Sequence, residues 1–374
     1  MGTGWWMEFA CYHEYMDLLG TSVVACLYSA ALFRRLMGKR IRWPPQPRVK
    51  LRLAPQLSNC SRKRVRARRS AVPEQDEMAL ERELMMLNKP YVKSFKDKYG
   101  VVFYCIDMYK QPAFDHPLLK NHKLQVTKRA NCERIRVHPQ ESCPDGTVLI
   151  RRTLKQHLVN ASVSLPRFRP QKDHSEIPGQ HFAQLLVDSV EGSKFQAAGA
   201  NMEVDNVAVP AGQVSSAQIL LVDDSCHSSV VSVVQSGWSE QSIHKQGDSQ
   251  TRFMTLWTAD DCRMTGCLNT LCRGFVVVSQ TAAPAIVLRP GFAGISISKD
   301  GLTGNWQVFL NQEMVGYFPK ELINNMAGAT QVQMGGITYA PPSQKSPPMG
   351  TRVAPVPGKV TLASKFAQGQ GAGR

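Results

Sequence analysis

Two adjacent aspartates are the first residues here that suggest hydrolytic chemistry. Asp260 and Asp261 in "WTADD" (257–261) supply two carboxyl groups, and a carboxyl pair can activate a water and protonate a leaving group. Successive side chains of a strand point to opposite faces, so adjacent aspartates do not converge on one water. We therefore predict a turn at this point rather than an acid pair.

Cysteine and histidine offer nucleophilic or metal chemistry, but their spacing supports neither. Cys262 needs a positioned histidine base, whereas His181, His227 and His244 are scattered and no serine elbow lies beside them. The ten cysteines contain no CxxC pair and no zinc-finger spacing. We predict no metal, no cofactor, and cysteines that are packed or form disulfides.

The third candidate is a glutamine where an acid would be useful. In "VVQSGWSEQ" (233–241), strand-forming valines precede Gln235, and Gly-Trp follows soon after. Strand alternation places Gln235 on the face of Val233 and Glu240 on the opposite face. Glutamine keeps the shape of glutamate but transfers no proton near neutral or acid pH. From the residues alone, Gln235 is a polar strand residue and Ile337, further along, a core residue.

The elements that position these residues begin near residue 181. From there, short apolar or alternating runs recur between Gly, Asp, Asn and Pro, which predicts an all-β antiparallel sandwich. Within it, only 318–327 reads as a helix. Upstream, 76–92 predicts an amphipathic helix ended by Pro90, while 100–114 and 143–158 each predict a strand beside a turn.

The charge divides the 374 residues unevenly. Residues 1–70 hold +11 of the net +16, so the body is only mildly basic and no nucleic-acid partner is expected for it. The uncharged run 18–33 is marginal for a membrane span, and acidic residues precede it, unlike a signal peptide. Membrane association is not expected. We read 1–75 as an atypical basic extension, disordered or mispredicted.

Five stretches, in order along the chain, resemble the neprosin family. "YKQPAFDHPLLKNH" (109–122) and "CPDGTVLIRR" (143–152) are similar to its activation segment. "GDSQTRFMTLWTADDCRMTGCLNTLCRGFV" (247–276) is similar to the centre of its peptidase domain. "KDGLTGNWQVFLNQEMVGYFPKELI" (299–323) and "MGGITY" (334–339) are similar to its later strands. On this basis we divide the chain into an activation-type segment (76–160), a linker (161–180) and a peptidase-like domain (181–365).

The resemblance implies a secreted or endomembrane plant glutamic peptidase, covered by its N-terminal segment until that is removed. It implies an antiparallel β-sandwich of neprosin type whose concave face carries two glutamates. One carboxylate activates a water, and the other, held protonated, protonates the leaving amine. The best-known member cleaves after proline at acid pH.

Both family glutamates are replaced in this chain. Gln235 in "VVQSGW" takes the place of the first and Ile337 in "MGGITY" that of the second. Neither side chain transfers a proton, so we predict a fold that survives without peptidase activity. Peptide or protein binding in the old groove is still expected, with Trp238, Trp257 and Trp306 as groove candidates.

Cysteines and one asparagine complete the candidate sites. Cys267 and Cys272 form the first predicted disulfide, and Cys105 and Cys143, in the two activation-segment motifs, the second. Asn160 begins an Asn-Ala-Ser glycosylation triplet. The family's final strands find no match after about residue 365, which predicts an uncovered sheet edge.

Two other functions stay open at this point. One is an active acid-pH glutamic endopeptidase, cleaving after proline with acids that lie elsewhere in the sequence. The other is a basic nucleic-acid- or membrane-associated protein acting through residues 34–69. The sequence gives no indication of the oligomeric state.

Overall fold

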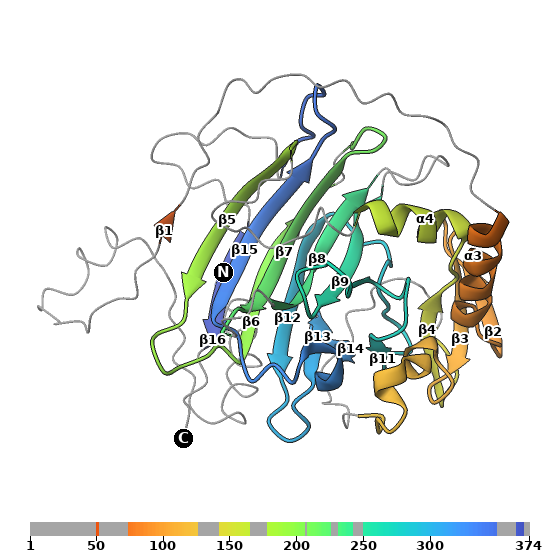
Figure 1. Cartoon of the computed structure of the whole chain (residues 1–374). Coiled ribbons are helices and arrows are strands. Elements are labelled where there is room, and N and C mark those ends of the chain that lie inside the picture. Colours follow the sequence, from red (N-terminus) through yellow and green to blue (C-terminus); the bar gives the residue numbers. More distant parts are fainter. Residues whose placement is uncertain are drawn as a thin grey trace, which may run out of the picture.

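The computed structural model describes residues 50–51, 74–125, 142–164, 178–205, 208–225, 231–241, 250–349 and 364–369. In these residues two antiparallel sheets face each other, and a small third sheet with two helices lies beside them (Figure 1). The predicted β-sandwich with a preceding activation-type segment is confirmed. No helix of the described residues is long and apolar enough to cross a membrane. The apolar run 18–33 lies outside them.

The first sheet has seven strands in the order β1-β5-β15-β7-β8-β9-β10. All its neighbouring pairs are antiparallel. In chain order these strands are β1 (Lys50–Leu51), β5 (Gln180–Asp188), β7 (Val214–Asp223), β8 (Ser232–Gln241), β9 (Arg252–Thr258), β10 (Cys267–Leu268) and β15 (Gln331–Tyr339). The two residues of β1 therefore bring part of the basic extension onto the sheet edge.

The second sheet has six strands in the order β11-β14-β13-β12-β6-β16. They are β6 (Ala197–Val204), β11 (Val276–Val277), β12 (Gly291–Lys299), β13 (Trp306–Leu310), β14 (Glu313–Phe318) and β16 (Ser364–Gly369). Strand β16 pairs with β6, so the edge predicted to be open is covered there.

The main core lies between these two sheets. Ile219 and Leu221 of β7 and Val234 of β8 point into it, as does Trp238, whose indole N–H donates to the Glu203 carbonyl on β6 (2.9 Å). Strand alternation then leaves the even residues of β7 and the odd residues of β8 on the outer face of the seven-stranded sheet. Gln235 is one of these outer residues.

The activation-type segment, taken here as residues 74–164, forms the third sheet and its helices. It contains α3 (Glu74–Leu87), β2 (Lys93–Lys96), β3 (Val102–Asp107), η1 (Pro112–Asp115), η2 (Pro117–Leu119), β4 (Thr147–Arg151) and α4 (Lys155–Ser164). Helix α3 confirms the predicted helix, but its apolar face is only partly covered: Leu87 is buried, whereas Met78 and Met85 are exposed. Helix α4 was not predicted. It packs against α3, and Lys155 forms an ion pair with Glu77, so tertiary contact overrides weak local signals.

The helix predicted at 318–327 is only a short 3-10 turn, η4 (Lys320–Ile323). Asn324 and Asn325 follow it with φ of 52° and 53°, a left-handed backbone that ends helical structure.

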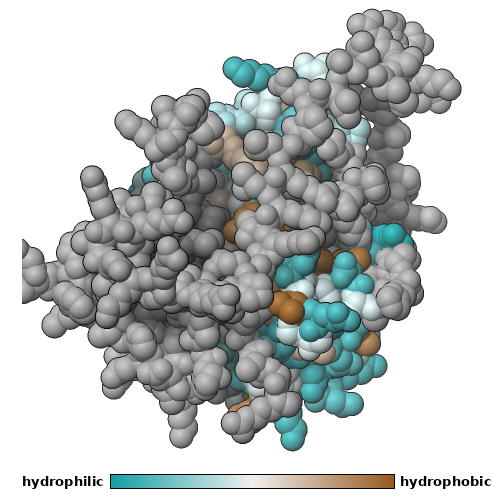
Figure 2. Space-filling view, turned by 90° about the vertical axis from the view of Figure 1, so that its left-hand side faces the viewer, coloured by the Kyte–Doolittle hydropathy of each residue, from teal (hydrophilic) through white to brown (hydrophobic). Residues whose placement is uncertain are grey.

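The surface seen from the β5 side gives no sign of a broad apolar face where described residues reach it. Figure 2 shows mainly hydrophilic residues there, with hydrophobic ones scattered among them. Scattered apolar residues are normal on a protein surface and do not define a docking face.

Candidate functional site

Gln235 is fully buried in the middle of β8, on the outer face of the seven-stranded sheet. It lies opposite Leu220 of β7, and its side-chain amide donates to the carboxamide oxygen of Gln218, two residues along that strand. This pairing leaves the Gln235 Oε1 and the Gln218 Nε2 without a hydrogen-bond partner among the described residues. The pair thus keeps one carboxamide oxygen and one amide nitrogen without a partner among the described residues.

Gln218 belongs to a row that crosses four strands. The register places Gln184 of β5, Gly335 of β15, Gln218 of β7 and Gly237 of β8 side by side. Gln184 is 5 % exposed, and neither atom of its carboxamide has a partner among the described residues. We call Gln184, Gln218 and Gln235 the amide row.

The two glycines of this row are required by space. A Cβ on Gly237 would lie 2.2 Å from the Ala217 carbonyl oxygen and 2.8 Å from the Gln218 Cβ. Gly335 has φ of 145°, and a Cβ there would lie 2.1 Å from the Ala183 carbonyl oxygen. No side chain therefore stands between the glutamines at these two points.

Apolar clusters flank the amide row on the same face. One cluster consists of Leu220, Val222, Val231 and Val233. The other consists of Val214, Met254, Leu256 and Leu268, with Tyr339 packed against it. A buried amide that stays unpaired in such a surface costs about 1–3 kcal/mol.

Ile337 lies on this face too, on β15, and is fully buried. The Ser216 hydroxyl donates to its carbonyl oxygen (3.1 Å). Ile337 is two strands from Gln235 and four residues along the strand direction, which strand dimensions convert to about 17 Å between the Cα atoms. Glutamates at these two positions would have to extend toward each other to share a water.

Carboxylates are nearly absent from the described strands of this face. The one present is Asp188 at the end of β5, which accepts a hydrogen bond from the Gln331 amide (2.6 Å). Asp188 is three strands from Gln235, about 14 Å across the sheet. Glu240 is buried on the opposite face, as strand alternation predicted.

The predicted turn at Asp260 is confirmed. Asp260 accepts hydrogen bonds from the backbone N–H groups of Arg263, Met264 and Thr265 and from the Thr265 hydroxyl. Burial raises its pKa, but these hydrogen bonds outweigh burial and the pKa is lowered. Asp261 and Cys262 follow with positive φ, as in a tight turn.

The three tryptophans proposed for the groove do not line this face. Trp238, Trp257 and Trp306 are all at most 4 % exposed and belong to the main core. Trp257 lies opposite Val234, not opposite Gln235, so it faces inward. Their role in the structure is packing, because a strand's alternation sends them between the sheets.

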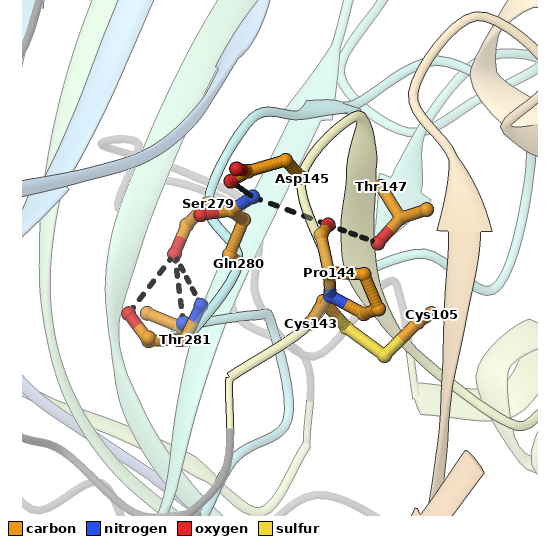
Figure 3. The surroundings of a disulfide bond; sticks show 9 residues. Cys105, Cys143, Pro144, Asp145, Thr147, Ser279, Gln280 and Thr281 are labelled. Carbon is orange, nitrogen blue, oxygen red and sulfur yellow. Dashed lines mark hydrogen bonds between the residues drawn. A yellow bond between two sulfur atoms is a disulfide. The ribbon is translucent and has the colours of Figure 1, made fainter. Parts of the chain in front are cut away.

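Both predicted disulfides are present. Cys105–Cys143 joins β3 to the segment before β4 within the activation-type segment (Figure 3), and Cys267–Cys272 closes a short loop. Asn160 lies within α4, outside the residues whose side chains are described. Among the described residues, no group of three or more metal-ligating side chains occurs.

Gln184 and Gln218 were missed by sequence reasoning. A polar residue inside the apolar run "QILLV" (218–222) was the available signal for Gln218. Gln184 gave no signal, because only the antiparallel pairing of β5 with β15 brings it into the row.

Two family models match this chain. The model described as Neprosin activation peptide matches residues 94–198, and the model described as Neprosin matches residues 211–368. The chain therefore belongs to the neprosin family.

Solved structures match parts of this chain at low similarity. Scytalido-glutamic peptidase with a peptide-based transition-state analogue is 14% identical over 44% of this chain and 70% of its own, with a TM-score of 0.26. A homodimeric agglutinin from chicken liver is 11% identical over 42% of this chain and 92% of its own, with a TM-score of 0.24. Similarities this low do not separate a peptidase from a lectin.

Proposed function

We propose that this chain is a non-catalytic neprosin-type protein that binds an uncharged peptide segment on the outer face of its seven-stranded sheet. The observation that carries the proposal is the amide pair of Gln235 and Gln218, buried where the family resemblance implies a catalytic glutamate. A carboxamide transfers no proton near neutral or acid pH.

The loss of chemistry follows from the side chains present. Each general acid or base contributes on the order of 10²–10⁴-fold to rate, so replacing both by Gln235 and Ile337 removes most of the acceleration. Asp188, the carboxylate on the described strands of this face, is too distant to replace either one. An active peptidase with differently placed acids is therefore disfavoured.

The binding part rests on complementarity. Peptide groups present one donor and one acceptor each, and the amide row offers donors and acceptors of the same kind that have no partner among the described residues. Apolar side chains flank it on both sides. An uncharged segment fits because the charged side chains described on this face, Asp188 and Arg252, lie at strand ends away from the three glutamines.

The first experiment measures cleavage and binding together. Full-length protein is incubated with an uncharged proline-containing peptide between about pH 2 and pH 5, and products are followed by mass spectrometry. We expect no cleavage, and binding by calorimetry that weakens at least tenfold in Gln218→Met/Gln235→Met. Gln156→Met, an exposed glutamine of α4, is the matched control and should bind as the unaltered protein does. Cleavage by the unaltered protein would refute the non-catalytic assignment.

A gain-of-function experiment tests the position of the lost pair. Gln235→Glu/Ile337→Glu restores two carboxyl groups on one face, and we expect acid-dependent hydrolysis that Gln235→Met/Ile337→Val lacks. Hydrolysis confined to the glutamate variant supports the placement. A correctly folded glutamate variant without hydrolysis argues against Ile337 as the second position.

A further inference from the structure

The activation-type segment and the sandwich share one hydrophobic core. Phe103, Ile106 and Leu149 of the segment are at most 2 % exposed and belong to the same cluster as the core between the sheets. Ala113 packs in a second cluster with Val276 and Tyr317 of the sandwich. Separating the two parts would expose this apolar surface to water, at about 25 cal/mol for each Å².

Backbone hydrogen bonds continue across the boundary. The Cys143 N–H donates to the Gln280 carbonyl (2.9 Å), and the Leu149 N–H donates to the Ser279 carbonyl (3.1 Å). The Gln280 side chain returns two bonds, to the Pro144 carbonyl (3.2 Å) and the Asp145 carboxylate (3.1 Å), as Figure 3 shows. Buried backbone groups of both parts therefore depend on each other.

Gln111 makes the most complete polar contact of this boundary. It is 1 % exposed, and its carboxamide accepts from the Val277 N–H (2.8 Å) and donates to the Val277 carbonyl (3.0 Å). Its second amide hydrogen donates to the Met108 carbonyl (2.9 Å). The side chain thus replaces a neighbouring strand for residue Val277 of β11.

Tyr317 of β14 forms a second polar contact. Its hydroxyl accepts from the Gln125 N–H (3.0 Å) and bonds to the His122 ring (3.0 Å), whose other nitrogen lies 3.3 Å from Glu321. Gln125 Oε1 in turn accepts from the Asn305 amide (3.0 Å). Burial raises the pKa of Tyr317 to about 12, so the hydroxyl keeps its proton over the working range of a protein.

The position of these contacts matters. They lie on β11 and β14 of the six-stranded sheet and on nearby loop residues such as 279–280 and Asn305, whereas the amide row lies on the outer face of the seven-stranded sheet. Among the described residues, no hydrogen bond joins the segment to the amide row. Moreover, the activation-peptide match runs to residue 198 and includes all of β5 and the beginning of β6, which are strands of the two large sheets.

From these contacts we infer that the activation-type segment is a permanent part of this molecule. It occupies the β11 side of the sandwich as a non-covalent partner and stays bound when the chain is cut between α4 and β5. The occupant of this surface is residues 74–164 of the same chain, not an exchangeable ligand. Its removal would expose core rather than open a site.

A cut chain tests this inference. A recognition sequence for a site-specific protease is inserted between Ser164 and Gln180 of the full-length protein, and the cut product is passed over a sizing column at neutral pH and at pH 4. We expect the two pieces to elute together under both conditions and to separate only in denaturant. Separation under native conditions at neutral pH would overturn the inference.

Two single variants show whether the described contacts hold the pieces together. Tyr317→Phe in the cut protein removes only the hydroxyl that receives Gln125 and His122, and we expect dissociation at least fivefold faster. Tyr339→Phe makes the same chemical change on β15 of the other sheet and should leave dissociation unchanged. Equal dissociation of the two variants would contradict the assigned contacts.

Hydrogen exchange on the uncut chain is a second measurement, useful if the cut product aggregates. The amides of Leu149 and Val277 should exchange as slowly as those in the centres of β7 and β8, because their opening requires loss of the shared core. Fast exchange at both amides, beside slow exchange in β7 and β8, would also overturn the inference.

Discussion

Two sets of buried glutamines in this molecule differ in how completely their side chains are hydrogen-bonded. At the boundary with the activation-type segment, every polar atom of the Gln111 carboxamide is hydrogen-bonded, two of them to one residue of β11. On the outer face of the seven-stranded sheet, Gln218 and Gln235 bond to each other, and each keeps one polar atom unpaired. Both environments are almost fully buried, so exposure does not explain the difference.

The difference separates glutamines whose hydrogen bonds stabilise the fold from glutamines whose hydrogen bonds are incomplete among the described residues. A satisfied buried amide contributes to stability, and losing it leaves its backbone partners unpaired. An unsatisfied one is a cost that packing must offset, and an apolar residue in its place is neutral or better. The segment boundary is therefore structural, while the amide row is the place where we propose that a ligand binds.

The largest effect should come from the disulfide on the segment side. Cys105→Ala/Cys143→Ala opens a loop with a sequence separation of 38, and chain-entropy reasoning predicts a loss of about 4 kcal/mol in the free energy of unfolding. Cys267→Ala/Cys272→Ala opens a separation of 5 and should cost about 2 kcal/mol. Urea unfolding followed by tryptophan fluorescence measures both. The reverse order would break the view that the segment is a stabilising element.

The next largest effect is expected for Gln111→Met, which should lower the free energy of unfolding by about 3 kcal/mol. Methionine has nearly the same shape but leaves the Val277 N–H and carbonyl unpaired in a buried place. Lys110→Ala, an exposed neighbour, is the control and should change the free energy of unfolding by less than about 0.5 kcal/mol. A loss for Gln111→Met no larger than that of the control would remove the contrast between the two sets of glutamines.

Gln218→Met/Gln235→Met should cost at most about 1 kcal/mol, or stabilise the fold. Among the described residues, the two amides bond only to each other. Replacing both glutamines therefore leaves no backbone group without its hydrogen-bond partner. Urea unfolding of this double variant, compared directly with Gln111→Met, is the sharpest test of the comparison. A loss above about 2 kcal/mol would mean that the amide row is structural.

The smallest effect is a pH dependence at His116, where the segment meets Trp257. Burial, then the nearby Arg273, lowers the His116 pKa below 6.5, so the unfolded chain takes up this proton first. The corresponding stability is complete above about pH 6.5 and is lost as the pH falls through the folded value. His116→Asn keeps an acceptor for the Leu118 N–H (3.2 Å in the native chain) without titrating. This variant should reduce the change in the free energy of unfolding between pH 7 and pH 5, by less than about 1 kcal/mol. Thermal unfolding at each pH measures this change.

An unchanged pH profile in His116→Asn would show that protonation of this ring is not linked to folding. His122→Asn is a useful comparison, because it removes the contacts of His122 with Glu321 and Tyr317 and should weaken the boundary.

Much of the fold was available from the sequence. Alternating apolar residues define a strand without knowledge of its neighbours, so β5, β7, β8, β9 and the hairpin of β13 and β14 were predictable from period-two patterns. Cysteine spacing and the segment motifs likewise indicated Cys267–Cys272 and Cys105–Cys143, which the structure contains. That Gln235 takes the place of the family's first glutamate stays a prediction from the resemblance.

What the sequence left undetermined depends on which strands become neighbours. Register, not local pattern, aligns Gln184, Gln218 and the two glycines into one row, since these residues come from four strands separated by up to about 150 positions. Alternation alone does not determine which face of β8 and β9 is covered by the second sheet. For this reason Trp238 and Trp257 were predicted to line the groove, whereas they pack between the sheets. Helix α4 likewise forms against α3, a contact that no local window contains. The amino-acid sequence determines which side chains each strand carries, and the long-range pairing of the strands determines which of these side chains lie together.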